Sequence, residues 1–532
     1  MIQMPEPLDT LDRRYRAACK VLFKQEVGPL SEFVPYLDGL IEPNMHRKSS
    51  ISGKDVAYSL HEYSEGSKWI SFDEIDFGKK YAPIDAGAIT GLNSLLAAIS
   101  GRVYYTGNVI LGNSKFVESS SNVTDSFFMH NTSRLSDCKY CASTIVGRLC
   151  EDSFGVYGPG ETNYCIRCTQ TYRDKRCFEC WTCQNCSDCY YSYNLDACQD
   201  CIFCFNLKAK RYCIGNLQLG PADYNLIKEK LLAEMAAGLK RDKKLPSLMD
   251  IIQKSPKSNP PHAGAIEAAG RIDKNSIDAE FSKTAKLLLG TELRGMDLHK
   301  DWLERHTHPV EDRASIASGE RITMAPRLTA IPEIPHDRIV TMAQARALGE
   351  LTKMEPADVE KISLANVHEK LGKLAFLPVA FYEGTNMNII EGATSIDSSS
   401  CYRSSGTVYS KFCAYMFYTR NGERLFGCEQ VFDSSFCINC YYSNKLTRCF
   451  ECDSCRGCAD CLFCHNCENV QDSMFCFNVK NMKYAIGNAE VGRENYLVIK
   501  KMVLSEIGGK LQKEHDLKLD IYNAGVFQGE KT

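Results

Sequence analysis

Small and apolar side chains recur at every third position in two long segments of the chain. Every cysteine from Cys138 to Cys213 has a residue number divisible by three, and every cysteine from Cys401 to Cys476 leaves a remainder of two. An amphipathic helix would repeat at about 3.6 residues and a flat strand at about 2.0, and collagen would need glycine at every third position. The triplet therefore predicts a β-solenoid, a narrow coil that turns one side chain inward per triplet.

The two segments are copies of each other. Residues 176–216 align with residues 448–488 without a gap, so the numbering of the second copy is offset by 272 from that of the first. The same offset holds downstream, where Tyr224 falls on Tyr496. The sequence therefore predicts a tandem duplication, with two solenoid units joined by a linker.

The spacing of the cysteines also bears on the length of one turn. Steps of 12 in the numbering are common, as from Cys165 to Cys177 and on to Cys189, and steps of 15 are nearly as frequent. We favour turns of about 12 residues, stacked about 4.8 Å apart. Because an open sheet edge invites pairing, each rod needs a covered end. The helical pattern after each array, with Tyr224 and Ile227 on one face, supplies a cap.

Outside the arrays the chain alternates helical patterns with short strand-like stretches. Residues 240–262 are basic and contain prolines, as linkers do. The fold class expected is α+β, with two tandem cysteine-lined β-solenoid domains, helical caps and a helical connecting region. The expected units are a mixed N-terminal cap region (1–100), the first solenoid (101–220), a capping helix (221–245), a linker and helical region (246–375), the second solenoid (376–492) and a C-terminal capping helix with a tail (493–532).

Composition narrows the class of protein. The 532 residues are 44% hydrophobic and 24% charged, which is typical of a globular chain, and the net charge of −3 gives no overall basic excess for nucleic acid. The N-terminus lacks the apolar stretch of a secretory signal, and no run of about 18 apolar residues could span a membrane. We therefore expect a cytoplasmic protein in which the 28 cysteines remain thiols.

Cysteines spaced by three are also a zinc-ligand signal, since two such thiolates can reach one tetrahedral ion. The duplication weakens this interpretation, because Cys198 aligns with Val470 and Cys213 with Ala485. A metal ligand rarely exchanges with an apolar residue, whereas a small buried side chain does so readily. We therefore expect a thiol-lined core without a cofactor and keep zinc as the alternative. The zinc candidates have cysteine in both copies: Cys165, Cys168, Cys177, Cys180, Cys183, Cys186, Cys437, Cys440, Cys449, Cys452, Cys455 and Cys458.

The sequence contains no recognisable catalytic motif, so an enzyme is not expected. His299, His306 and His308 lie close together in the sequence. Solvated histidines at a helix end are the favoured interpretation of this group, and a metal site is the alternative.

Charged residues recur at outward positions of the two copies. Glu179 aligns with Glu451 and Asp188 with Asp460, which predicts a solvated row of carboxylates along each rod. Basic residues form two clusters that are candidates for a nucleic-acid or partner surface: Lys208, Lys210, Arg211, Lys240, Arg241, Lys243 and Lys244.

The end of each array resembles a class of cysteine-rich prokaryotic proteins that has no assigned activity. Those proteins carry CxxC arrays ending in a phrase of the form N-L-K-x-K-x-Y-x-I-x-N before a helix. The matching residues here are Asn206, Leu207, Lys208, Lys210, Tyr212, Ile214 and Asn216, and in the second copy Asn478, Val479, Lys480, Tyr484, Ile486 and Asn488, with Met482 in place of the second lysine. The resemblance covers the arrays and their caps, less than half of the chain, and implies a repeat fold only.

Rods present long surfaces and no evident active-site cleft. The function expected is therefore that of a non-catalytic cytosolic scaffold or binding protein that engages a macromolecular partner through the solenoid faces. The alternatives are a zinc-binding metalloprotein that uses the CxxC arrays, and a ribosome- or RNA-associated factor that uses the basic linker and the cluster at the rod end. The expected partner is a protein or ribonucleoprotein, or a second copy of the chain, with no membrane and no small-molecule substrate.

Overall fold

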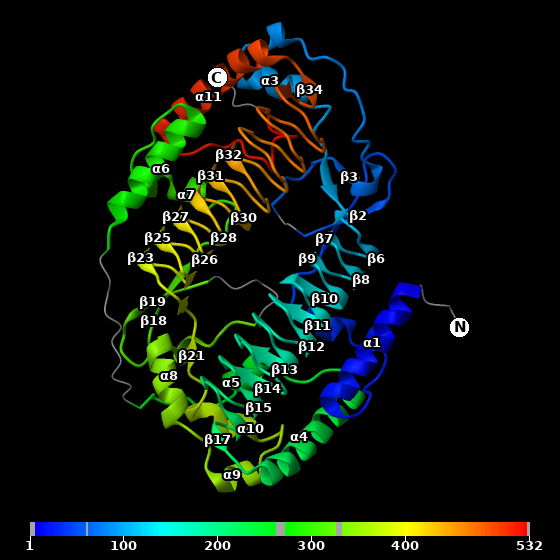
Figure 1. Cartoon of the computed structure of the whole chain (residues 1–532), viewed down its shortest axis with the longest axis vertical. Coiled ribbons are helices and arrows are strands. Elements are labelled where there is room, and N and C mark those ends of the chain that lie inside the picture. Colours follow the sequence, from blue (N-terminus) through cyan, green and yellow to red (C-terminus); the bar gives the residue numbers. More distant parts are fainter. Residues whose placement is uncertain (1–5, 60–61, 262–271, 326–331, 529–532) are drawn as a thin grey trace.

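The computed structural model describes residues 6–59, 62–261, 272–325 and 332–528. It is a mixed α+β molecule in which two stacks of strands lie side by side, with long helices along the outside of each stack (Figure 1). The stacks are named array one (residues 110–218) and array two (residues 381–490). Among the described residues, no helix is both long enough and apolar enough to cross a membrane.

Array one is a single sheet of 13 strands in which the chain pairs with itself one turn later. Cys165 lies opposite Cys177 in neighbouring parallel strands, and Cys201 lies opposite Cys213, a step of 12 in the numbering each time. This is the spacing that the cysteine pattern favours. The parallel strands are β5 (Ile110–Leu111), β6 (Lys115–Glu118), β7 (Ser121–Thr124), β8 (Phe127–His130), β9 (Ser133–Ser136), β10 (Lys139–Arg148), β11 (Glu151–Tyr157), β12 (Asn163–Ile166), β13 (Lys175–Trp181), β14 (Tyr190–Tyr193), β15 (Gln199–Ile202) and β16 (Arg211–Ile214).

Array two contains one sheet of five strands and one of six, with the same register. Cys437 lies opposite Cys449, again a step of 12. Beyond Phe450 the spacing continues as isolated parallel bridges, such as that between Leu462 and Met474. The strands are β22 (Phe381–Glu383), β23 (Met387–Ile390), β24 (Thr394–Ile396), β25 (Ser399–Tyr402), β26 (Gly406–Val408), β27 (Lys411–Ala414), β28 (Tyr418–Arg420), β29 (Glu423–Phe426), β30 (Val431–Phe432), β31 (Ser435–Ile438) and β32 (Thr447–Phe450).

A residue with positive φ directly precedes the inward side chain in most triplets of both arrays. Arg176, Glu179 and Thr182 have φ angles of 54°, 50° and 55°, and a buried cysteine follows each of them. The left-handed conformation turns the chain sharply and costs a non-glycine residue roughly 1–2 kcal/mol. Hydrogen bonds between turns offset this cost, as where the Thr182 N–H donates to the Thr169 carbonyl one turn earlier at 2.8 Å. The triplet period therefore originates in the backbone, because the chain makes one sharp turn before each inward side chain.

The same order of elements occurs twice along nearly the whole chain. The first half contains α1 (Glu6–Phe23), the antiparallel pair β1 (Met45–Lys48) and β2 (Asp55–Tyr58), the parallel pair β3 (Trp69–Ser71) and β4 (Tyr105–Gly107), array one with its last strand β17 (Leu217–Gln218), and α4 (Pro221–Asp242). The second half contains α6 (Lys274–Leu289), the antiparallel pair β18 (Glu311–Ala314) and β19 (Arg321–Met324), the parallel pair β20 (Ile339–Val340) and β21 (Leu377–Pro378), array two with its end hairpin β33 (Ala485–Ile486) and β34 (Ala489–Glu490), and α11 (Arg493–Glu514). Shorter helices fill the connections: α2 (Val34–Asp38), α3 (Leu92–Ile99), α5 (Leu248–Gln253), α7 (Lys300–Leu303), α8 (Met342–Leu351), α9 (Pro356–Glu360) and α10 (Val367–Lys370).

The segment that precedes each array binds the helix that follows the other array. Before array one, the Leu92 N–H donates to the Glu506 carboxylate on α11 at 3.1 Å. Before array two, the Leu364 N–H donates to the Glu234 carboxylate on α4 at 3.0 Å. The offset of 272 relates the two donors to each other and the two acceptors to each other.

The arrays themselves take part in the same exchange. The Asn206 amide at the end of array one donates to the carbonyl of Phe376 at 2.7 Å, and the Asn478 amide at the end of array two donates to the carbonyl of Tyr104 at 2.7 Å. Each half of the chain thus contacts the array of the other half, while α1 packs on array one and α6 on array two within their own halves. We refer to this arrangement as the reciprocal exchange.

Two kinds of core hold each half together. The thiols form the interior of the arrays, separate from a second core between the arrays and the helices. Outward aromatic side chains such as Phe178 and Trp181 belong to the second core, because helices and connecting segments cover them. The helices that follow the arrays bury Tyr224 and Tyr496, the face that the sequence predicts for a cap.

Candidate functional site

The cysteines predicted to line the rods face the interior of the arrays. All twelve zinc candidates are at most 2% exposed. The thiol of Cys449 lies 3.6 Å from the carbonyl of Thr447 and 3.5 Å from that of Cys458, so two backbone acceptors are within its reach. A thiol that donates to a carbonyl keeps its proton, which favours a packed core over a ligand set.

The arrangement of the thiols offers little to a metal ion. Within the described ranges there is no group of three or more histidine, cysteine, aspartate or glutamate side chains placed to hold an ion. Burial raises the pKa values of Cys180, Cys183 and Cys452 well above that of a free thiol, whereas hydrogen bonds from neighbouring thiols lower those of Cys177 and Cys458. The protonation of the thiols therefore does not decide for or against zinc. Zinc binding through the CxxC arrays stays an untested prediction.

A carboxyl group, that of Asp174, occupies an inward position of array one. Serine at such positions accepts the N–H of the inward residue one turn later, as Ser443 does from Cys455 at 2.9 Å. Asp174 does the same through Oδ1, which accepts from the Cys186 N–H at 2.7 Å. Its Oδ2 is buried with no hydrogen-bond partner, and burial raises the pKa of this carboxyl well above its usual range. The aligned position of array two is Leu446, so the carboxyl is particular to array one.

The prediction that Glu179 and Glu451 belong to a solvated row of carboxylates is wrong, because both side chains are fully buried. Glu179 accepts from the Arg167 guanidinium at 2.6 Å and from the Leu248 N–H at 3.0 Å. Glu451 accepts from the Ile521 N–H at 3.1 Å. Each carboxylate anchors the segment that follows the capping helix, so a position that points away from the rod axis is still interior to the molecule.

The predicted basic clusters are spread over the surface and largely paired. Lys244 is exposed. The other six bond to neighbouring side chains: Lys208 with Asp196 (2.8 Å), Lys210 with Glu350 (3.1 Å), Arg211 with Asp200 (3.7 Å), Lys240 with Gln25 (2.6 Å), Arg241 with Asp242 (2.7 Å) and Lys243 with Glu32 (2.6 Å). Helix α4, with 22 residues and a length of about 33 Å, separates the first cluster from the second. The clusters do not form one basic surface, and RNA binding through them stays an untested prediction.

His306 bridges two carboxylates from distant parts of the chain. Its Nδ1 lies 2.9 Å from Glu62 Oε2 and its Nε2 lies 2.9 Å from Asp520 Oδ2. Because ionised carboxylates only accept hydrogen bonds, both ring nitrogens carry protons. Burial alone would lower the pKa of His306, but the hydrogen bonds to Asp520 and Glu62 outweigh it and raise the pKa to about 9.

The other two histidines of this stretch have separate surroundings. His308 lies 2.7 Å from the buried Glu429 carboxylate, and His299 is 1% exposed with its pKa lowered to about 4, chiefly by burial. The three side chains therefore make neither a metal site nor a solvated helix end. They tie the connecting region to array two and the C-terminal segment.

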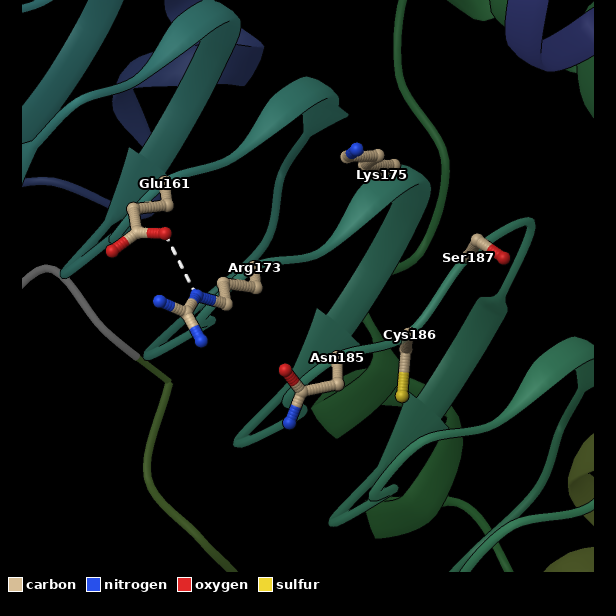
Figure 2. Close-up of a pocket in the computed structure, with 6 residues that line it drawn as sticks. All are labelled: Glu161, Arg173, Lys175, Asn185, Cys186 and Ser187. Carbon is tan, nitrogen blue, oxygen red and sulfur yellow. Dashed lines mark hydrogen bonds and ion pairs between the residues drawn. The ribbon is translucent and has the colours of Figure 1, made fainter.

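A shallow hollow of about 610 Å³ lies on the exposed face of array one that no described helix covers (Figure 2). Figure 2 shows Glu161 and Arg173 pointing toward one another from adjacent turns, with Arg173 Nε 2.7 Å from Glu161 Oε2. The hollow is lined by Glu161, Arg173, Lys175, Asn185, Cys186 and Ser187. Two cations, one carboxylate, an amide and a hydroxyl suit a polar or anionic group of a partner rather than an apolar ligand.

Two exposed tyrosines, one in each array, are absent from the candidates predicted from the sequence. Tyr172 of array one is 43% exposed and Tyr409 of array two is 52% exposed. At the offset of 272 they align with Asn444 and Asp137. A comparison of the two copies at outward positions could have identified them, because each tyrosine aligns with a polar residue in the other copy.

Comparison with protein-family models, curated proteins and solved structures finds no match to this chain. The function is therefore argued from the geometry alone.

Proposed function

We propose that this chain is a non-catalytic binding protein, in which two β-solenoids hold a macromolecular partner against their exposed sides. The regular register from turn to turn and the single inward side chain per triplet support the solenoid interpretation. Partner binding rests on one observation. On the side of each array that helices leave uncovered, exposed side chains repeat in register from turn to turn.

These side chains are held by contacts to the same position one turn away. Lys208 pairs with Asp196 at 2.8 Å in array one, and Lys480, which is half-buried over the Phe77 ring, pairs with Glu468 at 2.7 Å in array two. The Asn469 amide donates to the Asn481 side chain at 3.4 Å. A surface whose side chains are already ordered loses little entropy when a partner binds, so binding is more favourable than on a mobile surface.

Site-specific photocrosslinking in cells tests this proposal. A photoreactive amino acid is placed at exposed positions on the uncovered sides, Ala197 and Ala209 in array one and Asn469 and Asn481 in array two. The control position is Leu226 on α4, which is 72% exposed but lies on a covering helix. We expect array positions to crosslink to a common macromolecule and the control to give no such product. Absence of a product from all four array positions would contradict the proposal.

A further inference from the structure

Two histidine rings meet in a hollow outside the arrays, where the end of α11 faces the segment that follows α6. The centres of the His299 and His515 rings are 5.0 Å apart, and the ring planes are at 84° to each other. The hollow has a volume of about 440 Å³. It is lined by Glu292, Leu293, Arg294, His299, Gln512 and His515. We name His299 and His515 the histidine pair.

Each ring of the histidine pair has a nitrogen atom that no described residue uses. Nδ1 of His299 and Nδ1 of His515 are both buried and have no hydrogen-bond partner within the described part of the chain. Because the pKa of His299 is lowered to about 4, this ring is neutral at neutral pH and has a lone pair to offer. A buried nitrogen without a partner destabilises a fold, so the two atoms call for an explanation.

Packing and backbone geometry do not require these histidines. The His299 ring lies among aromatic side chains, with its centre 5.8 Å from that of Phe281 and 6.1 Å from that of Trp302, so an apolar residue would suit the same place. His515 ends α11 with a positive φ of 57°. Lys243, which is 272 residues earlier, ends α4 with a φ of 56°. The helix end therefore accepts a residue other than histidine.

The separation of the rings fits two imidazoles that share one metal ion. A ligating nitrogen lies about 2.1 Å from zinc and about 1.1 Å from the centre of its own ring, so each ring centre is about 3.2 Å from the ion. At the tetrahedral angle two such centres are about 5.2 Å apart. The 5.0 Å of the histidine pair is close to this value. Imidazole nitrogen is a ligand that zinc, copper and nickel ions prefer.

The surroundings of the histidine pair also suit a cation. The last carbonyls of α11 carry partial negative charge, and His515 follows them directly. Glu292 brings a carboxylate to the hollow, and the Gln512 amide holds this segment by donating to the Glu292 carbonyl at 3.2 Å. Arg294 lies 3.4 Å from that carboxylate, but it is 81% exposed and its charge is largely in water. Such an exposed ion pair is weak, so the carboxylate is free to turn toward an ion.

We propose that the histidine pair binds one divalent transition-metal ion of the zinc class. The two imidazoles supply half of a tetrahedral set and water completes it, with Glu292 able to replace one water. The bound ion ties the end of α11 to the segment that follows α6. This site is separate from the CxxC arrays, and the inference does not depend on the proposed binding function.

The test titrates the full chain with zinc chloride by calorimetry, after EDTA treatment and dialysis. We expect one site whose affinity falls by about tenfold or more in His515→Lys, since even the loss of an outer-shell partner has an effect of that size. This variant places at the end of α11 the residue that ends α4. His299→Gln should weaken binding in the same way. His336→Gln, whose side chain is 52% exposed, is the control and should bind zinc like the wild type.

A second readout separates this site from the thiols. Cobalt bound to imidazole and water should give a visible spectrum without the near-ultraviolet charge-transfer band that thiolate ligands add. Zinc should also raise the unfolding midpoint of the wild type more than that of His515→Lys, and midpoints without zinc check that the variants fold. The inference is overturned if the wild type does not bind zinc, or if it and His515→Lys bind zinc equally. Equal binding with the thiolate band would place the ion in the CxxC arrays.

Discussion

At the scale of single residues, the inward position of a triplet satisfies backbone groups as well as filling space. The Cys183 thiol lies 3.4 Å from the carbonyl of Trp181, just before it in the chain, and 3.9 Å from that of Ser192 in the next turn. The Ser192 hydroxyl in turn accepts the Cys204 N–H at 3.1 Å. Cysteine and serine are both small enough for the narrow interior, and their polar atoms meet donors and acceptors at the corners, where strand pairing is interrupted.

Replacing Cys183 with alanine should lower the free energy of unfolding by about 1–2 kcal/mol, because the change removes one buried sulfur atom and leaves a small cavity. Urea unfolding followed by circular dichroism measures the effect. Ser187→Ala, at a half-buried position on the outer side, is the control and should unfold like the wild type. If Cys183→Ala does not fold and the purified wild type carries near-stoichiometric zinc, the thiol core is the wrong interpretation and the zinc alternative is right.

The buried carboxyl of Asp174 should make stability depend on pH. In an unfolded chain an aspartate ionises at about pH 3.9, whereas burial raises the pKa of Asp174 in the native state. Above about pH 4 the unfolded state therefore releases a proton that the native state keeps, and stability falls as the pH rises. Asp174→Asn retains a side-chain oxygen for the Cys186 N–H and should remove this part of the pH dependence.

Thermal unfolding midpoints of the wild type and Asp174→Asn, measured from about pH 4 to about pH 8, test this prediction. The asparagine variant should gain stability relative to the wild type as the pH rises. Parallel curves for the two proteins would show that Asp174 ionises freely in the native state, which would contradict its burial.

At the scale of elements, the segment after α11 is held by charged groups that face one another in a confined space. His306 meets Asp520 from this segment and Glu62 from the first half of the chain. Glu451 accepts the neighbouring Ile521 N–H, and its pKa is raised to about 8 by burial and then by the Asp520 charge. Protonated His306 is therefore the cation that balances this cluster.

The variant His306→Gln should show how much this cation contributes to the stability of the fold. The pKa is about 9 in the native state and about 6.5 in an unfolded chain, so the stabilisation is fully present below about pH 6.5 and is lost as the pH rises through about 9. The difference in unfolding midpoint between the wild type and His306→Gln should accordingly be largest near pH 6 and vanish above about pH 9. His336→Gln, whose side chain is 52% exposed, is the control. A difference that stays constant with pH would rule out an imidazolium at this position.

At the scale of the whole molecule, the reciprocal exchange makes the two halves depend on each other. The pairs Leu92–Glu506 and Asn478–Tyr104 hold the first half to array two and its capping helix. The corresponding pairs hold the second half to array one. The peptide linkage between the halves is therefore only one of several connections between them.

A protease site placed between Ser258 and Asn259 tests this dependence. After cleavage we expect the halves to co-elute in size-exclusion chromatography without denaturant, because each still binds the array and the capping helix of the other. The double variant Asn206→Ala/Asn478→Ala should lower the urea concentration at which the cleaved halves separate, since both changes leave a carbonyl unpaired. Halves that separate on cleavage alone would contradict the reciprocal exchange.

The sequence predicts the interior of the arrays far better than the surroundings. The triplet period identifies the buried cysteines and favours the observed register, because both follow from the local backbone turn. It does not predict the hydrogen bond between Asn206 and Phe376, because these residues lie 170 residues apart and belong to different copies. The prediction that Glu179 lies in solvent fails for the same reason, since the period defines the rod axis but not what packs outside the rod. The exposed tyrosines Tyr172 and Tyr409 emerge only when outward positions of the two copies are compared.

The reciprocal exchange also constrains how the protein is made. Asn206 is translated 170 residues before its partner Phe376. At roughly 5–20 residues per second, the newly made first array waits roughly 10–30 s for the segment that contacts Tyr193 and Asn206. During that time α1 is already available to cover Phe178. During that interval two neighbouring nascent chains on one messenger RNA could trade segments, so chaperone capture or a low initiation rate would protect the yield of correctly assembled monomer.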